Sequence, residues 1–125
     1  MATELRPWGR FACISVDPAA ESNHLYFYKK VNRIGRGRVD IVIDQTFISR
    51  VHCIVSIDDI DNGVDGGPGY SVVLLDESRS GVYVNEVRVG KSQMRRLEHN
   101  YTIHFTTPGV RRLTPLVYKF ELLKG

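Results

Sequence analysis

The sequence predicts an all-β fold, either a sandwich or a barrel, and three observations lead to that prediction. The chain has 125 residues, 42% of them hydrophobic and 25% charged, which suits one soluble domain with one core. Its apolar residues recur in short alternating runs, and turn-forming residues interrupt these runs. No stretch keeps the helical period of about 3.6 residues over any length.

The expected strands are rich in Val, Ile, Tyr and Phe, which pack well on a pleated surface. They cover residues 10–16, 25–31, 41–43, 52–57, 70–76, 82–85, 101–106 and 116–122. The best candidate for a helix is the segment 92–99, where Met94 and Leu97 share one face. That segment is long enough for one or two turns at most.

Polar segments at 17–23, 58–69 and 107–115 are expected to be loops. The segment 58–69 is too rich in glycine to hold a strand, and we expect it to be mobile. No internal repeat and no linker divides the chain. We therefore expect a single domain over residues 1–125, with its core between about residues 8 and 123.

Charge and cysteine content narrow the class of protein further. Lys and Arg outnumber Asp and Glu by 17 − 14 = 3, an excess too small and too dispersed for a nucleic-acid arm. Cys13 and Cys53 lie far apart, which favours free, buried thiols in a reducing compartment. There is no secretory signal and no apolar run that could span a membrane. We expect an intracellular domain with no metal and no cofactor, because its His and Cys residues lack paired ligand spacing.

The first of three polar islands is Gly35-Arg36, which follows an expected strand. Gly35 allows a tight turn, and Arg36 offers a planar set of donors that matches phosphate oxygens. An ordinary solvated arginine in a hairpin loop would explain the same residues.

The second island is Ser49-Arg50-Val51-His52, just before another expected strand. Ser49 can donate a hydrogen bond to a phosphate oxygen, and Arg50 adds a second positive charge. His52 is expected to turn inward and tie the loop to backbone groups. A catalytic Ser49–His52 pair is not expected, because the sequence has no Gly-x-Ser-x-Gly elbow and no carboxylate to orient the histidine.

The third island extends over residues 76–85. Arg79 and Ser80 occupy a connection that Gly81 ends, although a plain turn also explains these residue types. Asn85 is expected to hold the next turn by a local hydrogen bond.

Two other functions fit parts of the sequence, but less well than these islands fit a phosphate site. Residues 85–92 nearly match a nucleotide-binding P-loop, but Asn85 replaces its first glycine and no βαβ unit surrounds it, so we expect no enzyme. A basic β-fold that binds nucleic acid is the alternative. It is less favoured, because the aromatic residues alternate as core residues would: Tyr26, Phe27, Tyr28, Tyr101 and Phe105.

Taken together and in this order, the islands resemble the forkhead-associated (FHA) domain, a module that reads phosphothreonine. The resemblance extends from about Trp8 to Leu123. The family pattern is Gly-Arg, then Ser-x-x-His, then Ser-x-Asn-Gly followed by Val-Asn, and its first two elements are intact here. The resemblance implies a β-sandwich of two twisted, mostly antiparallel sheets, with the ligand loops at one end.

The resemblance also implies roles for individual residues. Where the family has an asparagine that grips the main chain of the ligand, this chain has Ser80, which is shorter and offers one donor. Val51 or Val82 is the expected apolar niche for the methyl group that distinguishes threonine from serine. The residues expected to bind the phosphopeptide are Arg36, Ser49, Arg50, Arg79 and Ser80, and those expected to support the site are Gly35, His52, Gly81 and Asn85.

Among FHA domains, the segments 7–10, 90–97 and 118–123 look most similar to those of DNA-damage checkpoint effector kinases. In such kinases an N-terminal FHA domain recruits phosphorylated partner proteins. This subfamily resemblance implies a nuclear location and phosphothreonine-containing partners. The chain has no kinase motif, so any kinase domain would lie outside it.

Overall fold

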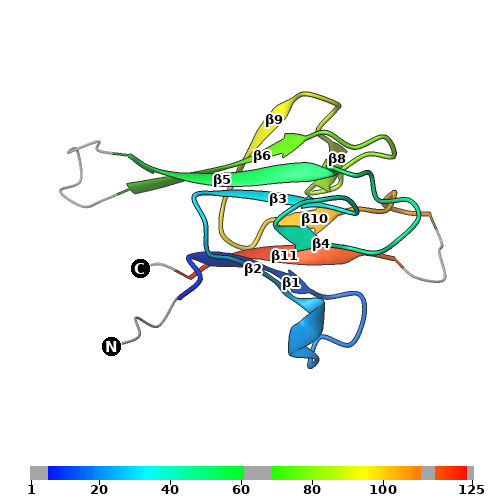
Figure 1. Cartoon of the computed structure of the whole chain (residues 1–125), viewed down its shortest axis with the longest axis horizontal. Coiled ribbons are helices and arrows are strands. Elements are labelled where there is room, and N and C mark those ends of the chain that lie inside the picture. The colour runs from blue at the N-terminus through cyan, green and yellow to red at the C-terminus, as the bar shows by residue number, and fades with distance from the viewer. Residues whose placement is uncertain (1–5, 61–68, 111–114, 124–125) are drawn as a thin grey trace.

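The computed structural model describes residues 6–60, 69–110 and 115–123, and they form a sandwich of two β-sheets (Figure 1). The first sheet has the spatial order β2 (Leu25–Phe27), β1 (Gly9–Cys13), β11 (Val117–Leu122), β10 (Thr102–His104), β7 (Tyr83–Val84) and β8 (Val87–Arg88). The second has the order β4 (Ile41–Val42), β3 (Val31–Gly35), β5 (Cys53–Ile60), β6 (Gly69–Asp76) and β9 (Met94–Leu97). A short 3₁₀ turn, η1 (Glu21–Asn23), precedes β2. The expectation of two mostly antiparallel sheets is confirmed, with β3 and β4 as a parallel pair.

The core lies between the two sheets and is dominated by aromatic rings from the first. The Phe11 ring meets Phe27 edge to face at 4.8 Å between centroids, and the Phe105 ring lies 5.3 Å from Tyr118. Ile34, Val55 and Leu74 close the core from the second sheet. Because Phe27 and Phe105 are buried, neither ring is available to stack on a nucleic-acid base.

One expected strand and the expected helix differ from the structure. The expected strand 25–31 is divided between β2 and β3, and the Trp8 indole donates a hydrogen bond to the Lys29 carbonyl at that turn (2.7 Å). The helix candidate 92–99 is instead the strand β9, which pairs with β6 at Val72 and Leu97. Met94 and Leu97 do not share a buried face, since Met94 is 69% exposed. Pairing with β6 therefore outweighs a weak local helical pattern.

The loop expected at 58–69 is shorter than the sequence suggested. β5 extends to Ile60 and β6 begins at Gly69, and these two residues are cross-strand partners. The remainder of that segment lies outside the described residues, as do residues 111–114 of the expected loop 107–115.

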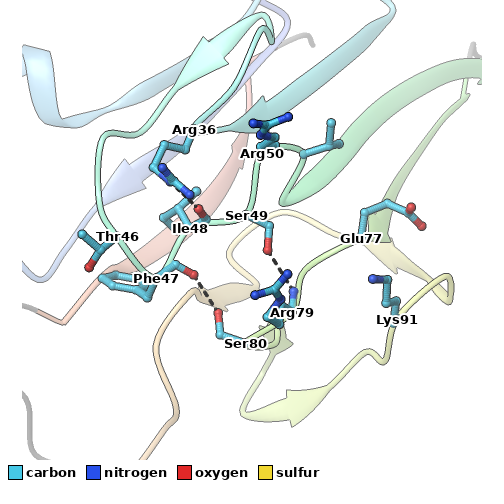
Figure 2. Close-up of a pocket in the computed structure, with 11 residues that line it drawn as sticks. Arg36, Thr46, Phe47, Ile48, Ser49, Arg50, Glu77, Arg79, Ser80 and Lys91 are labelled. Carbon is cyan, nitrogen blue, oxygen red and sulfur yellow. Dashed lines mark hydrogen bonds between the residues drawn. The ribbon is translucent and has the colours of Figure 1, made fainter.

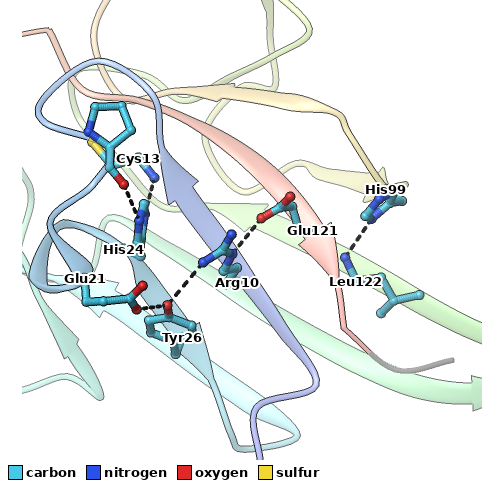
Figure 3. Close-up of polar contacts among 9 residues, drawn as sticks. Arg10, Cys13, Glu21, His24, Tyr26, His99, Glu121 and Leu122 are labelled. Carbon is cyan, nitrogen blue, oxygen red and sulfur yellow. Dashed lines mark hydrogen bonds and ion pairs between the residues drawn. The ribbon is translucent and has the colours of Figure 1, made fainter.

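The outer face of the first sheet carries a chain of polar contacts across β1, β2 and β11 (Figure 3). Arg10 forms an ion pair with Glu121 (2.6 Å) and donates to the Tyr26 hydroxyl (3.2 Å). The Tyr26 hydroxyl in turn donates to Glu21. His24 accepts the Cys13 backbone N–H (2.9 Å), so this face also anchors the connection between β1 and β2.

Several features of the described residues bear on the class of protein. Cys13 and Cys53 are buried and unbridged, and burial raises the pKa of the Cys53 thiol. Within the described ranges, no helix has the length and apolar character needed to cross a bilayer. No group of His, Cys, Asp and Glu side chains in those ranges is arranged to hold a metal ion.

Candidate functional site

A groove of about 490 Å³ opens at one end of the sandwich (Figure 2). This is the end where β3 and β6 end and β5 begins (Figure 1). All five residues expected to contact a phosphopeptide line it. Its lining consists of Arg36, Thr46, Phe47, Ile48, Ser49, Arg50, Val51, Glu77, Arg79, Ser80 and Lys91. The five expected residues come from three separate loops, and Lys91 joins them from a fourth segment between β8 and β9.

The first two loops are joined by their backbones. The N–H of Arg36 donates to the Ser49 carbonyl (3.0 Å), and the N–H of Gly37 donates to the Arg50 carbonyl (3.1 Å). Gly35 makes this approach possible, because a β-carbon there would lie 2.1 Å from the Arg50 carbonyl oxygen. The close approach places Arg36 and Arg50 on neighbouring parts of the groove wall.

His52 lies beneath the second loop and turns inward. Its Nδ1 accepts the Ser49 backbone N–H (3.1 Å), and its buried ring meets Phe105 edge to face at 5.1 Å. Burial lowers the pKa of His52 to about 4, although the Asp76 carboxylate and the Gly81 backbone oppose that shift. The ring is therefore neutral at physiological pH, as its acceptor role toward Ser49 requires.

The third loop is held by the buried carboxylate of Asp76 at the end of β6. This carboxylate accepts hydrogen bonds from the Ser78 backbone N–H (2.8 Å), the Ser78 hydroxyl (2.6 Å) and the Gly90 backbone N–H (3.2 Å). The Ser78 hydroxyl accepts the N–H of Gly81, whose φ of +109° favours glycine. Three donors satisfy the buried carboxylate, and it fixes the segments that carry Arg79 and Lys91.

Two side-chain hydrogen bonds tie the second and third loops together (Figure 2). Ser49 Oγ accepts the backbone N–H of Arg79 (2.9 Å), and Ser80 Oγ donates to the Phe47 carbonyl (3.0 Å). The Ser49 hydroxyl hydrogen has no acceptor among the described residues, so it can be donated to a ligand. The Ser80 hydrogen is already used, which leaves Ser80 as an acceptor only.

The groove is strongly basic. Arg36, Arg50, Arg79 and Lys91 contribute four positive charges against the single carboxylate of Glu77. Arg36 Nε donates to the Ile48 carbonyl (3.0 Å), which orients the guanidinium. Its two terminal nitrogens have no hydrogen-bond partner among the described residues, so they can bind a ligand. Such an arrangement can bind a dianion through charge-assisted hydrogen bonds.

Of the three other residues expected near the ligand, only one lies at the groove. Val51 lines the groove, whereas Val82 is fully buried in the core and offers no surface to a ligand. Asn85 is not among the lining residues. It occupies the turn between β7 and β8 with φ of +50°, and its side chain accepts the Thr102 N–H (3.0 Å) rather than a neighbour in sequence.

Sequence reasoning missed Lys91 and Glu77 as lining residues. In the sequence, Lys91 belongs to the near match to a P-loop and to the segment 90–97 that resembles checkpoint kinases, and neither pattern places it at the groove. The signal in the sequence for this position is the preceding Gly90, a turn residue. In the structure Gly90 has φ of +101°, and its N–H donates to the Asp76 carboxylate at the end of β6. Glu77 follows the buried Asp76 directly, and no local pattern distinguishes it from a solvent-facing residue.

The comparisons with known proteins agree with this geometry. The sequence matches the FHA domain model over residues 32–106, more than half of its length, so the chain belongs to the FHA domain family. FHA domains are binding modules for phosphothreonine peptides. A search of curated protein sequences found no significant match.

Solved FHA structures share the fold at low sequence identity. The MEK1 FHA domain is 18% identical over 93% of this chain and 90% of its own, with a TM-score of 0.69. The yeast Dun1 FHA domain, solved with a doubly phosphorylated peptide derived from Rad53, is 19% identical over 100% of this chain and 81% of its own (TM-score 0.68). The N-terminal FHA domain of Rad53p from S. cerevisiae, solved with a phosphothreonine peptide, is 19% identical over 91% and 92% (TM-score 0.66).

Proposed function

We propose that this chain binds phosphothreonine peptides in the groove and thereby recruits phosphorylated partner proteins, without catalysing a reaction. The observation that carries the proposal is the convergence of Arg36, Ser49 and Arg50 on one wall. A phosphate group carries about −1.5 to −2 charges at neutral pH. Two guanidinium groups and a free hydroxyl hydrogen match that charge and its oxygen acceptors.

The groove wall is already ordered before a ligand arrives. The bond from Arg36 Nε to Ile48 holds the guanidinium in place, so less side-chain entropy is lost on binding. Val51 supplies apolar surface beside Arg50, where one methyl group of threonine would add about 0.8 kcal/mol over serine. Arg79 and Ser80 lie where they can contact the peptide main chain.

The test of this function is the loss of Arg36. We expect Arg36→Ala to weaken binding of a phosphothreonine peptide by at least about 100-fold, because two charge-assisted hydrogen bonds disappear. Isothermal titration calorimetry measures the affinity, and thermal melting checks that the fold persists. Arg36 is exposed, so its removal should leave the core unchanged.

Arg96→Ala is the matched control, since Arg96 is an exposed residue of β9 outside the groove and its loss removes the same charge. The control should bind as the wild type does. Equal affinity of Arg36→Ala and Arg96→Ala would refute the proposal, as would equal affinity of the wild type for phosphorylated and unphosphorylated peptide.

Ser80 provides a second test, which concerns the peptide main chain. Because its hydroxyl hydrogen is bonded to Phe47, Ser80 has no donor left for a ligand. Ser80→Asn should restore an amide donor and tighten binding about fivefold, the effect of one net hydrogen bond. Unchanged affinity by calorimetry, with chemical-shift changes still centred on this loop, would show that another residue holds the peptide.

We further propose that the partners belong to DNA-damage or cell-cycle signalling and that the protein acts in the nucleus. The resemblance of the segments 7–10, 90–97 and 118–123 to those of checkpoint kinases supports this, and so does the fold shared with the Dun1 and Rad53p domains. On the same grounds, a kinase domain is the expected companion in a longer chain. A tagged protein that stays outside the nucleus with and without DNA damage would contradict the proposed location.

A further inference from the structure

A second hollow of about 600 Å³ adjoins the groove on the side of the loop after β3. It shares Arg36, Arg50 and Val51 with the groove and adds Gly37 and Arg38. The sequence alone does not single out Arg38 as a binding residue. Figure 2 shows Arg36 across the groove from Glu77 and Lys91, and the lining of the second hollow includes neither of these two residues.

The backbone builds this hollow and holds its arginines close together. The two hydrogen bonds from Arg36 and Gly37 to the carbonyls of residues 49 and 50 align the loop after β3 with the loop before β5. Gly37 lets the second loop approach, since a β-carbon there would lie 3.1 Å from the Arg50 β-carbon. Arg38 follows Gly37 in the loop. A hydrogen bond from the Val39 N–H to the Gly37 carbonyl (3.1 Å) closes a tight turn with Arg38 at its centre.

The charge of this hollow exceeds what one phosphate can balance. Its lining has three guanidinium groups and no carboxylate. Within the described residues, Arg36, Arg38 and Arg50 form no ion pair, although Arg33, close by on β3, is paired with Asp40. A phosphate with about −2 charges in the groove would be matched by Arg36 and Arg50. Arg38, which lines the same hollow as these two arginines, would then remain without a counter-charge.

We propose that the second hollow is a subsite for a second anionic group on the same peptide, either a phosphate or a carboxylate, which Arg38 contacts. This inference rests on the proposed phosphothreonine binding in the groove, and it specifies the class of ligand: a peptide with two separate anionic groups. Arg50 lies between the two positions and interacts with both anions. Electrostatic attraction makes the second contact sensitive to salt, because the hollow is open to solvent.

The experiment uses synthetic peptides with one phosphothreonine flanked by alanines, into which glutamate or phosphoserine is placed at one position at a time. Fluorescence anisotropy at about 0.05 M and about 0.3 M salt measures each affinity. At one or two positions, we expect the second anion to tighten binding about fivefold at low salt, with phosphoserine exceeding glutamate. If glutamate and phosphoserine tighten binding equally, a carboxylate is sufficient as the second anionic group.

Arg38→Ala should remove this gain and leave the affinity for the singly phosphorylated peptide within about twofold of the wild type. Arg38→Glu should reverse the preference, so that lysine becomes favoured at the same peptide position. Arg96→Ala, which removes a charge outside both hollows, should keep the full gain.

The outcomes separate this inference from the proposed function. If the singly phosphorylated peptide binds but no position yields a gain, or if Arg38→Ala keeps the gain, the second subsite is refuted and phosphothreonine binding stands. If no phosphopeptide binds the wild type, both proposals fail. If single-stranded DNA displaces the singly phosphorylated peptide and loses affinity in Arg38→Ala, the hollow serves nucleic acid and the inference is overturned.

Discussion

Replacing Gly35 by alanine is expected to lower the free energy of unfolding by at least about 3 kcal/mol. A β-carbon at this position would lie 2.1 Å from the carbonyl oxygen of Arg50 and 2.9 Å from that of Ser49. Both are backbone atoms, so no change of rotamer can relieve the clash. The loop before β5 must move away from β3, and its hydrogen bonds to Arg36 and Gly37 must lengthen or break.

Urea unfolding followed by tryptophan fluorescence measures this loss as a lower midpoint at unchanged slope. Gly37→Ala is the matched control two residues away, where a new β-carbon would lie 3.1 Å from the Arg50 β-carbon and 3.3 Å from its carbonyl oxygen, so a shift of a few tenths of an ångström relieves the contact. The control should lose less than about 1 kcal/mol. Equal stability of the two variants would mean that the loop tolerates displacement and that Gly35 does not set the geometry of the groove.

The second large effect concerns the protonation of His52. Burial lowers the pKa of the folded-state imidazole to about 4, well below the value near 6.5 of an unfolded chain. Between these two values the unfolded state binds more protons than the folded state, so stability rises with pH. The contribution is fully present above about pH 6.5 and is lost as the pH falls toward 4. We therefore expect the lowered pKa of His52 to reduce the free energy of unfolding by about 2 kcal/mol when the pH falls from 7.5 to 5.

His52→Asn isolates this effect, because the amide oxygen can still accept the Ser49 N–H but cannot be protonated. The variant should be less stable than the wild type at pH 7.5, since it loses the ring contact with Phe105. Its stability should nevertheless fall less steeply below pH 6.5. Burial also lowers the pKa of His104, but that group contributes to both proteins and cancels in the comparison. Parallel pH profiles would show that folding does not lower the pKa of His52.

Much of the fold follows from short-range patterns in the sequence. The alternating run in β6 buries Val72 and Leu74, as expected of a strand with one face toward a core. The boundaries were less accurate where two strands meet without a glycine or a proline, as between β2 and β3. The strand β9 was missed because its four residues alternate weakly and gain stability only by pairing with β6.

For the site, the sequence by itself determined the residue types and their order: a guanidinium after Gly35, a hydroxyl and a guanidinium at 49 and 50, and a polar turn ending at Gly81. These features can be predicted locally, because the preference of glycine and polar residues for turns depends mainly on the residues themselves. Tertiary structure alone decided which groups meet and which hydrogen atoms remain free. The bonds of Ser49 to Arg79 and of Ser80 to Phe47 join residues about thirty positions apart, and Lys91 reaches the same groove from a further segment of the chain. Arg38 and Arg50 line the same hollow because the backbone at Gly35 and Gly37 contacts the loop before β5. Such contacts between distant segments form only when the two sheets pack on their shared core.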